Sequence, residues 1–218
     1  TRFGRMGWSL PRFQRHQQEH IKHRAKEMLE NLEKLIDSGK TEYLFTVAEE
    51  GIRAEFKRQL STVWKKKLIP LPSLEPHDPD HKILSASIAA LQTISRQKAE
   101  ALARQILEEA EPLGQATKGP EPTLSALQDH QIERMVLDAR FQATGWRCLK
   151  CSSLGSGGSP GACPYCRGEI CSADLREGII AKAKSQGVGL FFTEDFSPLT
   201  NAGGIGALLK YKTSKKKD

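Results

Sequence analysis

The apolar positions in the first half of the chain change between helical and strand spacing. Apolar residues recur at helical spacing from about Leu10 to Ile36 and predict a long helix. The continuously apolar run Tyr43–Ala48 predicts a buried strand, and a helix is expected to follow at Glu49–Leu60. Leu68–Leu71 predicts a second strand, at a sheet edge because of its prolines. An apolar stripe then predicts a second long helix from Pro79 to about Ala110.

The second half repeats this change of spacing after a stretch rich in Gly, Pro and charge. That stretch, Pro112 to Pro122, is expected to be a linker. The elements expected after it are a short helix capped by Thr123, a strand at Arg134–Ala139, a helix capped by Ser172 or Asp174 and ended by Gly187, and strands at Val188–Thr193 and Gly203–Tyr211. The pattern predicts an α/β protein: a partial domain with a mixed sheet and long helices over 1–111, then a small α/β sandwich domain over 112–218.

Four cysteines stand between the predicted strand and helix of the second domain. Cys148 and Cys151 form one C-x-x-C pair, and Cys163 and Cys166 form a second, with eleven residues between the pairs. This spacing is typical of a structural zinc site with four thiolate ligands, so we expect a zinc ribbon inserted at 145–171. Four free thiols, two disulfides and a redox-active pair are the alternatives. Cys171 lies outside the spacing and is expected to be a buried thiol that is not a ligand.

The net charge of +7 over 218 residues is concentrated in three segments. Residues 1–26 carry a net charge of +6, residues 57–67 a net charge of +5, and residues 207–218 a net charge of +4. Such concentration favours a polyanionic partner, with RNA or DNA first, although any one basic segment can also be a solvated face.

The composition excludes a membrane protein at the sequence level. No apolar run approaches the length of a membrane span, and no secretory apolar segment stands at the start, so we expect a cytoplasmic protein with reduced thiols and no membrane partner. The chain begins with Thr1 rather than Met, and we expect it to be part of a longer protein.

Several stretches together resemble a known family. Gly145–Cys151, Cys163–Cys166 and the closing Gly203–Tyr211 (GGIGALLKY) look like the third domain of the archaeal/eukaryotic class-I peptide chain release factors, whose archaeal members carry a four-cysteine zinc minidomain. Gly4–Glu27 (GRMGWSLPRFQRHQQEHIKHRAKE) resembles the catalytic loop of the middle domain and the basic helix after it. Within the family the resemblance points to the bacterial group of homologues. It implies that the chain holds domains 2 and 3 only, without the domain that reads the stop codon.

The loop departs from the family pattern at the residue that matters for hydrolysis. True release factors carry Gly-Gly-Gln there, and the glutamine helps water to attack the peptidyl-tRNA ester. The triplet here is Met6-Gly7-Trp8, so only Gly7 matches. The Trp8 indole has a hydrogen-bond donor and no acceptor, but its ring can stack on a base. Gln14 is the candidate for a substitute, and whether the chain is an enzyme stays open.

The resemblance and the charge together predict a translation factor homologue that binds ribosomal RNA or tRNA, in release, rescue, quality control or hibernation. The residues expected to contact RNA are Arg2, Arg5, Trp8, Arg12, Arg15, Lys22 and Arg24. One alternative is an active peptidyl-tRNA hydrolase that works through Gly7, Trp8 and Gln14 in a non-standard loop. Another is an adaptor for a translational GTPase, because the family's third domain contacts such a partner. The three histidines His16, His20 and His23 are expected to lie on a solvated basic face rather than in a metal site.

Overall fold

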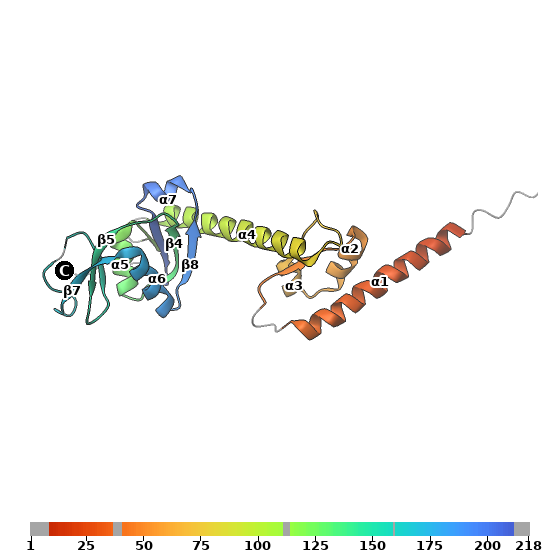
Figure 1. Ribbon diagram of the computed structural model, residues 1–218, viewed down its shortest axis with the longest axis horizontal. Coiled ribbons are helices and arrows are strands. Elements are labelled where there is room, and N and C mark those ends of the chain that lie inside the picture. The colour runs from red at the N-terminus through yellow and green to blue at the C-terminus, as the bar shows by residue number, and fades with distance from the viewer. Residues whose placement is uncertain (1–8, 37–40, 111–113, 159, 212–218) are drawn as a thin grey trace, which may run out of the picture. The chain divides into compact units, whose positions relative to one another are not determined.

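The computed structural model describes residues 9–36, 41–110, 114–158 and 160–211, with the side chains of residues 9–14 and 35 outside the description. The chain forms two compact units, Thr1–Ala90 and Leu91–Asp218. Both contain helices and strands, which confirms the α/β class (Figure 1). None of the helices in the described residues combines the length and the apolar character needed to cross a membrane.

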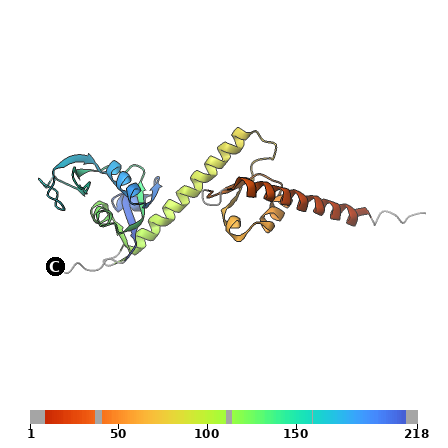
Figure 2. The same cartoon turned by 90° about the horizontal axis from the view of Figure 1, so that it is seen from below.

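The first unit is organised around helix α1, Ser9–Leu35, which matches the predicted helix closely. Among the described side chains of α1, those of its second half pack against the unit. There Ala25 is fully buried, and it shares a small apolar core with Phe56 and Leu60 around helix α2, Glu50–Gln59. Figure 2 shows α1 running past the shorter helices of this unit.

The strands of the first unit form a parallel pair, β1 (Leu44–Thr46) with β2 (Leu68–Pro70). The prediction of a buried strand at this position is wrong in its length and its burial, because only Thr46 is buried. A sheet of two strands with three residues each has too little area to be covered on both faces. Helix α3, Thr62–Lys67, was not predicted: it is too short to show a period and contains three consecutive lysines.

Helix α4, Asp80–Glu109, confirms the second long predicted helix. Its C-terminal half packs within the second unit through Leu102, Ala103 and Ile106, all of which are buried. The helix lies close to the sheet of this unit at Gly206, where an added Cβ would be 2.7 Å from Ile106 Cγ2. Glycine at this position is therefore required for the helix to lie on the strand.

The second unit contains a four-stranded mixed sheet with the order β3-β9-β4-β8. Strand β4 pairs in parallel with β8, while β9 is antiparallel to both β3 and β4. The bounds of these strands are Ala116–Lys118 for β3, Ile132–Asp138 for β4, Gly189–Thr193 for β8 and Ile205–Leu209 for β9. The predicted strands in this region correspond to β4, β8 and β9.

Helices cover both faces of this sheet. Helix α5 (Pro120–Gln128) and helix α6 (Leu175–Ser185) cover the face opposite to α4 (Figure 1). Along β4 the side chains alternate between the two cores: Met135 packs toward α5 and α6, and Val136 packs toward α4. This alternation is what a strand covered on both faces requires.

Three expectations for the second unit are wrong. The predicted linker contains strand β3 and the first turn of α5, which begins after Gly119 with φ +83° and places Pro120 where a helix needs no N–H donor. Thr123 is therefore buried inside the helix and does not cap it. A short helix α7, Ser197–Asn201, also stands between β8 and β9, where a loop was expected.

The cysteine segment forms a separate three-stranded antiparallel sheet with the order β6-β5-β7. Its strands are β5 (Thr144–Cys148), β6 (Leu154–Ser156) and β7 (Ile170–Asp174). The segment lies between β4 and α6, as the sequence predicted for the insert. We call it the cysteine module. Of the two predicted caps of α6, Asp174 is the one used, because its carboxylate accepts a hydrogen bond from the Arg176 N–H at 2.8 Å.

Candidate metal centre and basic helix

The first C-x-x-C pair lies in a tight turn at the end of β5. The N–H of Cys148 donates to the carbonyl of Ser153 at 2.9 Å, and the N–H of Ser152 donates back to the carbonyl of Cys148 at 3.1 Å. Ser152 has φ +55°, which turns the chain back on itself. The sulfurs of Cys148 and Cys151 consequently point toward the same point in space.

The second pair repeats this turn residue for residue. The N–H of Cys163 donates to the carbonyl of Gly168 at 2.9 Å, and the N–H of Arg167 donates to the carbonyl of Cys163 at 2.8 Å. Arg167 has φ +57°, as Ser152 has in the first turn. The two turns therefore present their cysteines in the same way, and we call them the first and second knuckle.

The two knuckles bring four sulfurs together. The Sγ atoms of Cys148, Cys151, Cys163 and Cys166 all lie within 4.8 Å of one another. Cys148 Sγ is 3.4 Å from Cys166 Sγ, and Cys151 Sγ is 3.6 Å from Cys163 Sγ. A tetrahedral metal with bonds of about 2.3 Å to sulfur needs sulfurs separated by roughly 3.8 Å. The predicted cysteines are thus arranged so that they can hold a metal ion.

The disulfide alternative does not describe this arrangement. All five cysteines are free thiols in the structure, and the short Sγ–Sγ distances connect one knuckle to the other. A redox-active pair is also disfavoured, because its two thiols would belong to one C-x-x-C motif at the start of a helix. Neither knuckle leads into a helix.

Donors around the sulfurs favour thiolates. The backbone N–H groups of Lys150 and Cys151 point at Cys148 Sγ at 3.3 and 3.4 Å and lower the pKa of Cys148. The Ser153 hydroxyl, 2.9 Å from Cys151 Sγ, is the main cause that lowers the pKa of Cys151 to about 6. The Gly168 N–H favours the Cys166 thiolate in the same way, but the neighbouring sulfurs and burial outweigh it and raise the pKa of Cys166 to about 12. A metal ion among the sulfurs would offset this repulsion and allow all four cysteines to bind it as thiolates.

Close packing leaves no room for a side chain at Gly168 or Gly155 of the module. A Cβ at Gly168 would lie 2.9 Å from Lys150 Cβ and 3.2 Å from Cys166 Sγ. A Cβ at Gly155 would lie 2.3 Å from the ring of Trp146, which is buried beside the cysteines. Glycine at both positions lets the knuckle and the aromatic ring approach the sulfur cluster.

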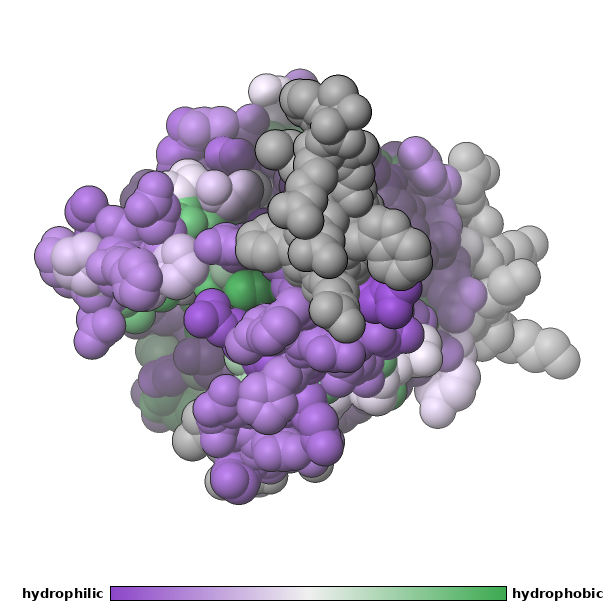
Figure 3. Space-filling view, turned by 90° about the vertical axis from the view of Figure 1, so that its right-hand side faces the viewer, coloured by the Kyte–Doolittle hydropathy of each residue, from purple (hydrophilic) through white to green (hydrophobic). Residues whose placement is uncertain are grey.

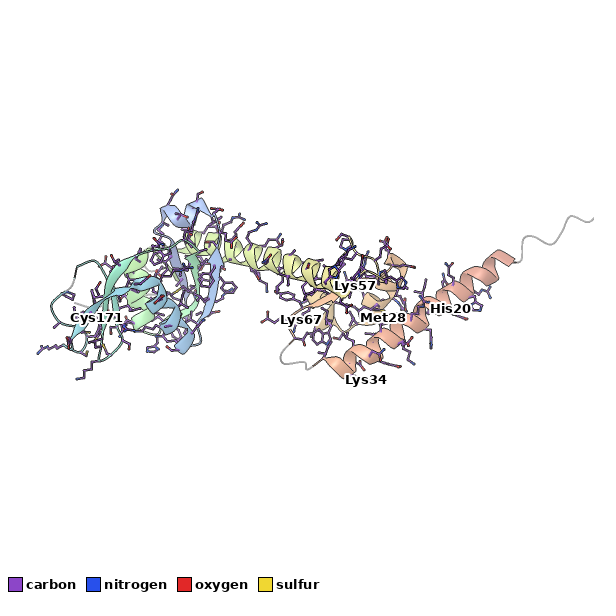
Figure 4. All side chains as sticks on the ribbon, in the orientation of Figure 1. His20, Met28, Lys34, Lys57, Lys67 and Cys171 are labelled. Carbon is purple, nitrogen blue, oxygen red and sulfur yellow. The ribbon has the colours of Figure 1, made fainter. Side chains whose placement is uncertain are left out.

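Cys171 is outside the cluster, as predicted, but its predicted burial is wrong. It lies on β7, is partly exposed, and its thiol donates to the Arg147 carbonyl at 3.6 Å (Figure 4). Sequence reasoning also missed two residues next to the metal ligands, Ser153 and Lys182. No motif marks Ser153, and Lys182 reaches the site from α6, so only the fold places it there.

The first half of α1 is the second candidate site. Every described side chain from Arg15 to His20 is exposed, and so are Lys22 and Arg24. Contact with the rest of the unit begins near Ile21, whose Cδ1 would lie 3.6 Å from a Cβ at Gly51. In Figure 3 the described side chains that face the viewer are mostly hydrophilic. This part of α1 therefore presents cations to solvent without an apolar packing partner among the described residues.

The histidines of α1 are exposed, and His16 stacks on His20 with ring centroids 4.6 Å apart. Figure 4 labels His20 in this half of the helix, and Met28 and Lys34 in the packed half. The cluster of metal-ligating side chains found among the described residues consists of the four cysteines and does not include these histidines.

The other predicted RNA-contact residues fall partly outside the description. Arg2, Arg5, Gly7 and Trp8 lie outside the described residues. Arg12 and Gln14 lie on the backbone of α1, with their side chains outside the description. The proposed contacts of these residues and the loop candidates therefore stay predictions.

The second basic segment is partly neutralised. Arg58 forms an ion pair with Glu55 at 2.6 Å, and this hydrogen-bonded contact lowers the pKa of Glu55 to about 2. Lys67 donates to the Thr41 carbonyl at 2.8 Å, with its amine 4.8 Å from the centre of the Trp64 ring. Both cations have partners within the unit, so this segment offers less free charge than its sequence indicates.

Comparison with known proteins identifies the class of fold. No protein-family model matches the chain, and no curated protein matches it significantly. Among solved structures, the fold is similar to that of archaeal Pelota. The resemblance noted in the sequence is thus confirmed at the level of fold.

One solved structure with this fold is a model of ribosome-bound archaeal Pelota and ABCE1. Its TM-score is 0.53 at 11% identity, and the match covers 90% of this chain and 50% of that one. Archaeoglobus fulgidus Pelota matches 98% of this chain and 56% of its own, with 14% identity and a TM-score of 0.41. The C-terminal domain of the Methanosarcina mazei peptide chain release factor matches 63% of this chain and 98% of its own, with 19% identity and a TM-score of 0.46. The chain spans about half the length of the Pelota structures.

Proposed function

We propose that this chain is part of a translation factor that binds the ribosome through RNA contacts of α1. The observation that carries the proposal is the fold shared with a ribosome-bound factor over 90% of this chain. The exposed cations Arg15, Lys22 and Arg24 support it, because a helix that presents cations without an apolar partner suits phosphate contacts. Arg2, Arg5, Arg12 and Trp8 are proposed to extend this surface.

Sedimentation with purified ribosomes tests the proposal. The 218-residue chain is expected to pellet with ribosomes at low salt, and the triple variant Arg15→Ala/Lys22→Ala/Arg24→Ala is expected to bind much more weakly. A matched control removes three other exposed cations, at Arg96, Lys118 and Lys184, and is expected to bind like the unmodified chain. An unmodified chain that stays in the supernatant at low salt contradicts the function. If both triple variants lose ribosome binding to the same extent, the proposed role of α1 is contradicted.

We propose that the metal held by the cysteine module is zinc and that it is structural. Four thiolates in tetrahedral array are the donor set zinc prefers in closed sites, and they leave no position for water or substrate. Elemental analysis of the purified chain is expected to give one zinc per chain. Cys163→Ser should lose this zinc, whereas Cys171→Ser should retain it, because Cys171 lies outside the cluster. Retention of zinc in both variants would contradict the proposal that the four cysteines hold the metal.

Peptidyl-tRNA hydrolysis is decided by a separate measurement. The Met6-Gly7-Trp8 triplet lacks the family's glutamine, so we propose that release by the standard mechanism does not occur. Release of labelled peptide from ribosome-bound peptidyl-tRNA is expected to stay at background. Release that is lost in Gly7→Ala or Gln14→Ala would instead establish an active loop.

A translational GTPase is the proposed protein partner. The family resemblance implies this contact for the unit that carries the cysteine module. A nuclease-treated pull-down with the chain is expected to retain such a GTPase. Its absence, with ribosome binding intact, would contradict this partner and leave the ribosome proposal standing.

A further inference from the structure

Lys182 connects three elements beside the sulfur cluster. It lies on α6, and its ammonium is hydrogen-bonded to the side-chain oxygen of Gln128, the last residue of α5. The same ammonium lies 3.4 Å from the carbonyl oxygen of Ser152, the residue that turns the first knuckle. The amine is therefore held where α5, α6 and the knuckle meet.

This position is unfavourable for an isolated cation. Lys182 is partly buried, and burial lowers its pKa. No carboxylate among the described residues forms an ion pair with it, and both of its hydrogen-bond acceptors are neutral. The Ser152 carbonyl that it contacts directly follows Cys151 in the chain, so the ammonium lies beside the sulfur cluster. A partly buried ammonium is retained at low cost only where a negative group compensates it.

The sulfur cluster supplies that negative group once it has bound a metal ion. Four thiolates around one divalent metal leave a net negative charge on the centre, which the surrounding protein has to stabilise. The N–H groups that point at Cys148 Sγ and the Ser153 hydroxyl beside Cys151 supply dipoles for this purpose. Lys182 adds a positive charge to these dipoles, because its ammonium extends from α6 to the Ser152 carbonyl of the first knuckle.

We propose that Lys182 is a positioning residue of the metal centre: its ammonium offsets the charge of the loaded tetrathiolate and holds the first knuckle against α5 and α6. The proposal rests on the proposed zinc site and adds a residue that no cysteine spacing reveals. It makes metal affinity depend on a side chain of the sandwich, so loading of the module and packing of α6 stabilise each other.

Zinc affinity of the 218-residue chain tests the proposal by competition with a chromophoric chelator. Lys182→Met keeps the apolar stem and removes the charge, and is expected to weaken zinc binding about 10- to 100-fold, as for other residues that support metal ligands. Lys184→Met is the matched control: Lys184 lies on the same helix, is exposed, and its loss is expected to leave the affinity unchanged. Lys182→Arg keeps the charge and is expected to recover most of the affinity.

Each outcome decides one of the two proposals. If the unmodified chain binds no zinc, the metal site itself fails. If it binds zinc and Lys182→Met binds as tightly as Lys184→Met, the role of Lys182 is overturned while the metal site stands. Weak binding by Lys182→Arg as well as Lys182→Met indicates that shape rather than charge matters, and also overturns the proposal.

A measurement without substitutions covers the case in which Lys182→Met does not fold. Amine labelling of the zinc-loaded chain, followed by mass spectrometry, is expected to modify Lys182 more slowly than Lys184 and to modify both similarly after chelation of the metal. Equal labelling of the two lysines in the loaded protein overturns the proposal.

Discussion

At the scale of single residues, the cysteine module depends on glycines, which have no side chain, as much as on the four sulfurs. Gly145 on β5 shows this most clearly, since a Cβ there would lie 2.2 Å from the Gly155 carbonyl oxygen and 2.9 Å from the Leu175 side chain. The contact joins two strands and a helix. Sequence alone shows a glycine but not the neighbours that make it necessary.

Gly145→Ala is therefore expected to destabilise the second unit by about 1–3 kcal/mol or more, because the backbone oxygen of Gly155 cannot move aside as a flexible side chain can. Gly158→Ala is the control: its Cβ would meet no atom within 4 Å, and its φ is not positive. Urea unfolding of the zinc-loaded proteins measures the difference. Two variants of equal stability would contradict the packing described for β5.

Asp138 is a buried carboxylate at the end of β4 that is held by two donors. Burial raises its pKa, but hydrogen bonds from the Thr200 hydroxyl at 2.5 Å and the Arg140 N–H at 2.8 Å outweigh burial and hold the pKa below its usual value. Because the folded-state pKa is depressed, the carboxylate stabilises the fold above its unfolded-state pKa of about 3.9. That contribution is lost as the pH falls through the folded-state pKa.

Thr200→Val should then cost about 1.5–3 kcal/mol at neutral pH, the usual range for a hydrogen bond to a charged group. The difference from the unmodified chain should shrink as the pH falls through the depressed folded-state pKa of Asp138, where the folded protein takes up the proton. Thermal unfolding over a pH series measures both. A cost that does not change with pH would show that the charge of Asp138 is not what Thr200 stabilises.

At the scale of elements, length decided what the sequence could predict. Helices α1 and α4 were predicted closely because their apolar period is repeated over many turns. The short elements α3, β3 and α7 were missed, since three to six residues show no period and their stability comes from tertiary contacts. The four cysteines were predicted for the same reason as the long helices: a spacing that is visible in the chain.

The packed half of α1 relies on very few apolar residues. Phe56 on α2 is almost fully buried against Ala25 and Leu60 and is the largest buried side chain of that core. Phe56→Ala is expected to cost about 3–5 kcal/mol. Hydrogen exchange should show faster exchange in α1 and α2, while zinc uptake by the second unit is retained. Loss of zinc in this variant would show that the two units do not fold independently.

At the scale of the whole molecule, the two candidate sites lie in different units. The metal centre belongs to the second unit, and the exposed cations of α1 belong to the first. We therefore propose that the metal stabilises the cysteine module and that the helix contacts the ribosome. The fold could be inferred from the resemblance, but at 11% identity the likeness does not by itself carry function to this chain.

The most direct test of ribosome binding is its dependence on salt, measured as the equilibrium affinity of the 218-residue chain for purified ribosomes over a series of KCl concentrations. Each phosphate contact is expected to add roughly 0.7–0.9 to the slope of log affinity against log salt. The unmodified chain should show a steep negative slope. The variant Arg15→Ala/Lys22→Ala/Arg24→Ala should show a shallower slope, reduced in magnitude by about 2–3 if each cation contacts one phosphate. No binding at low salt, or the same slope in both proteins, would contradict the assignment of α1 as the ribosome-binding element.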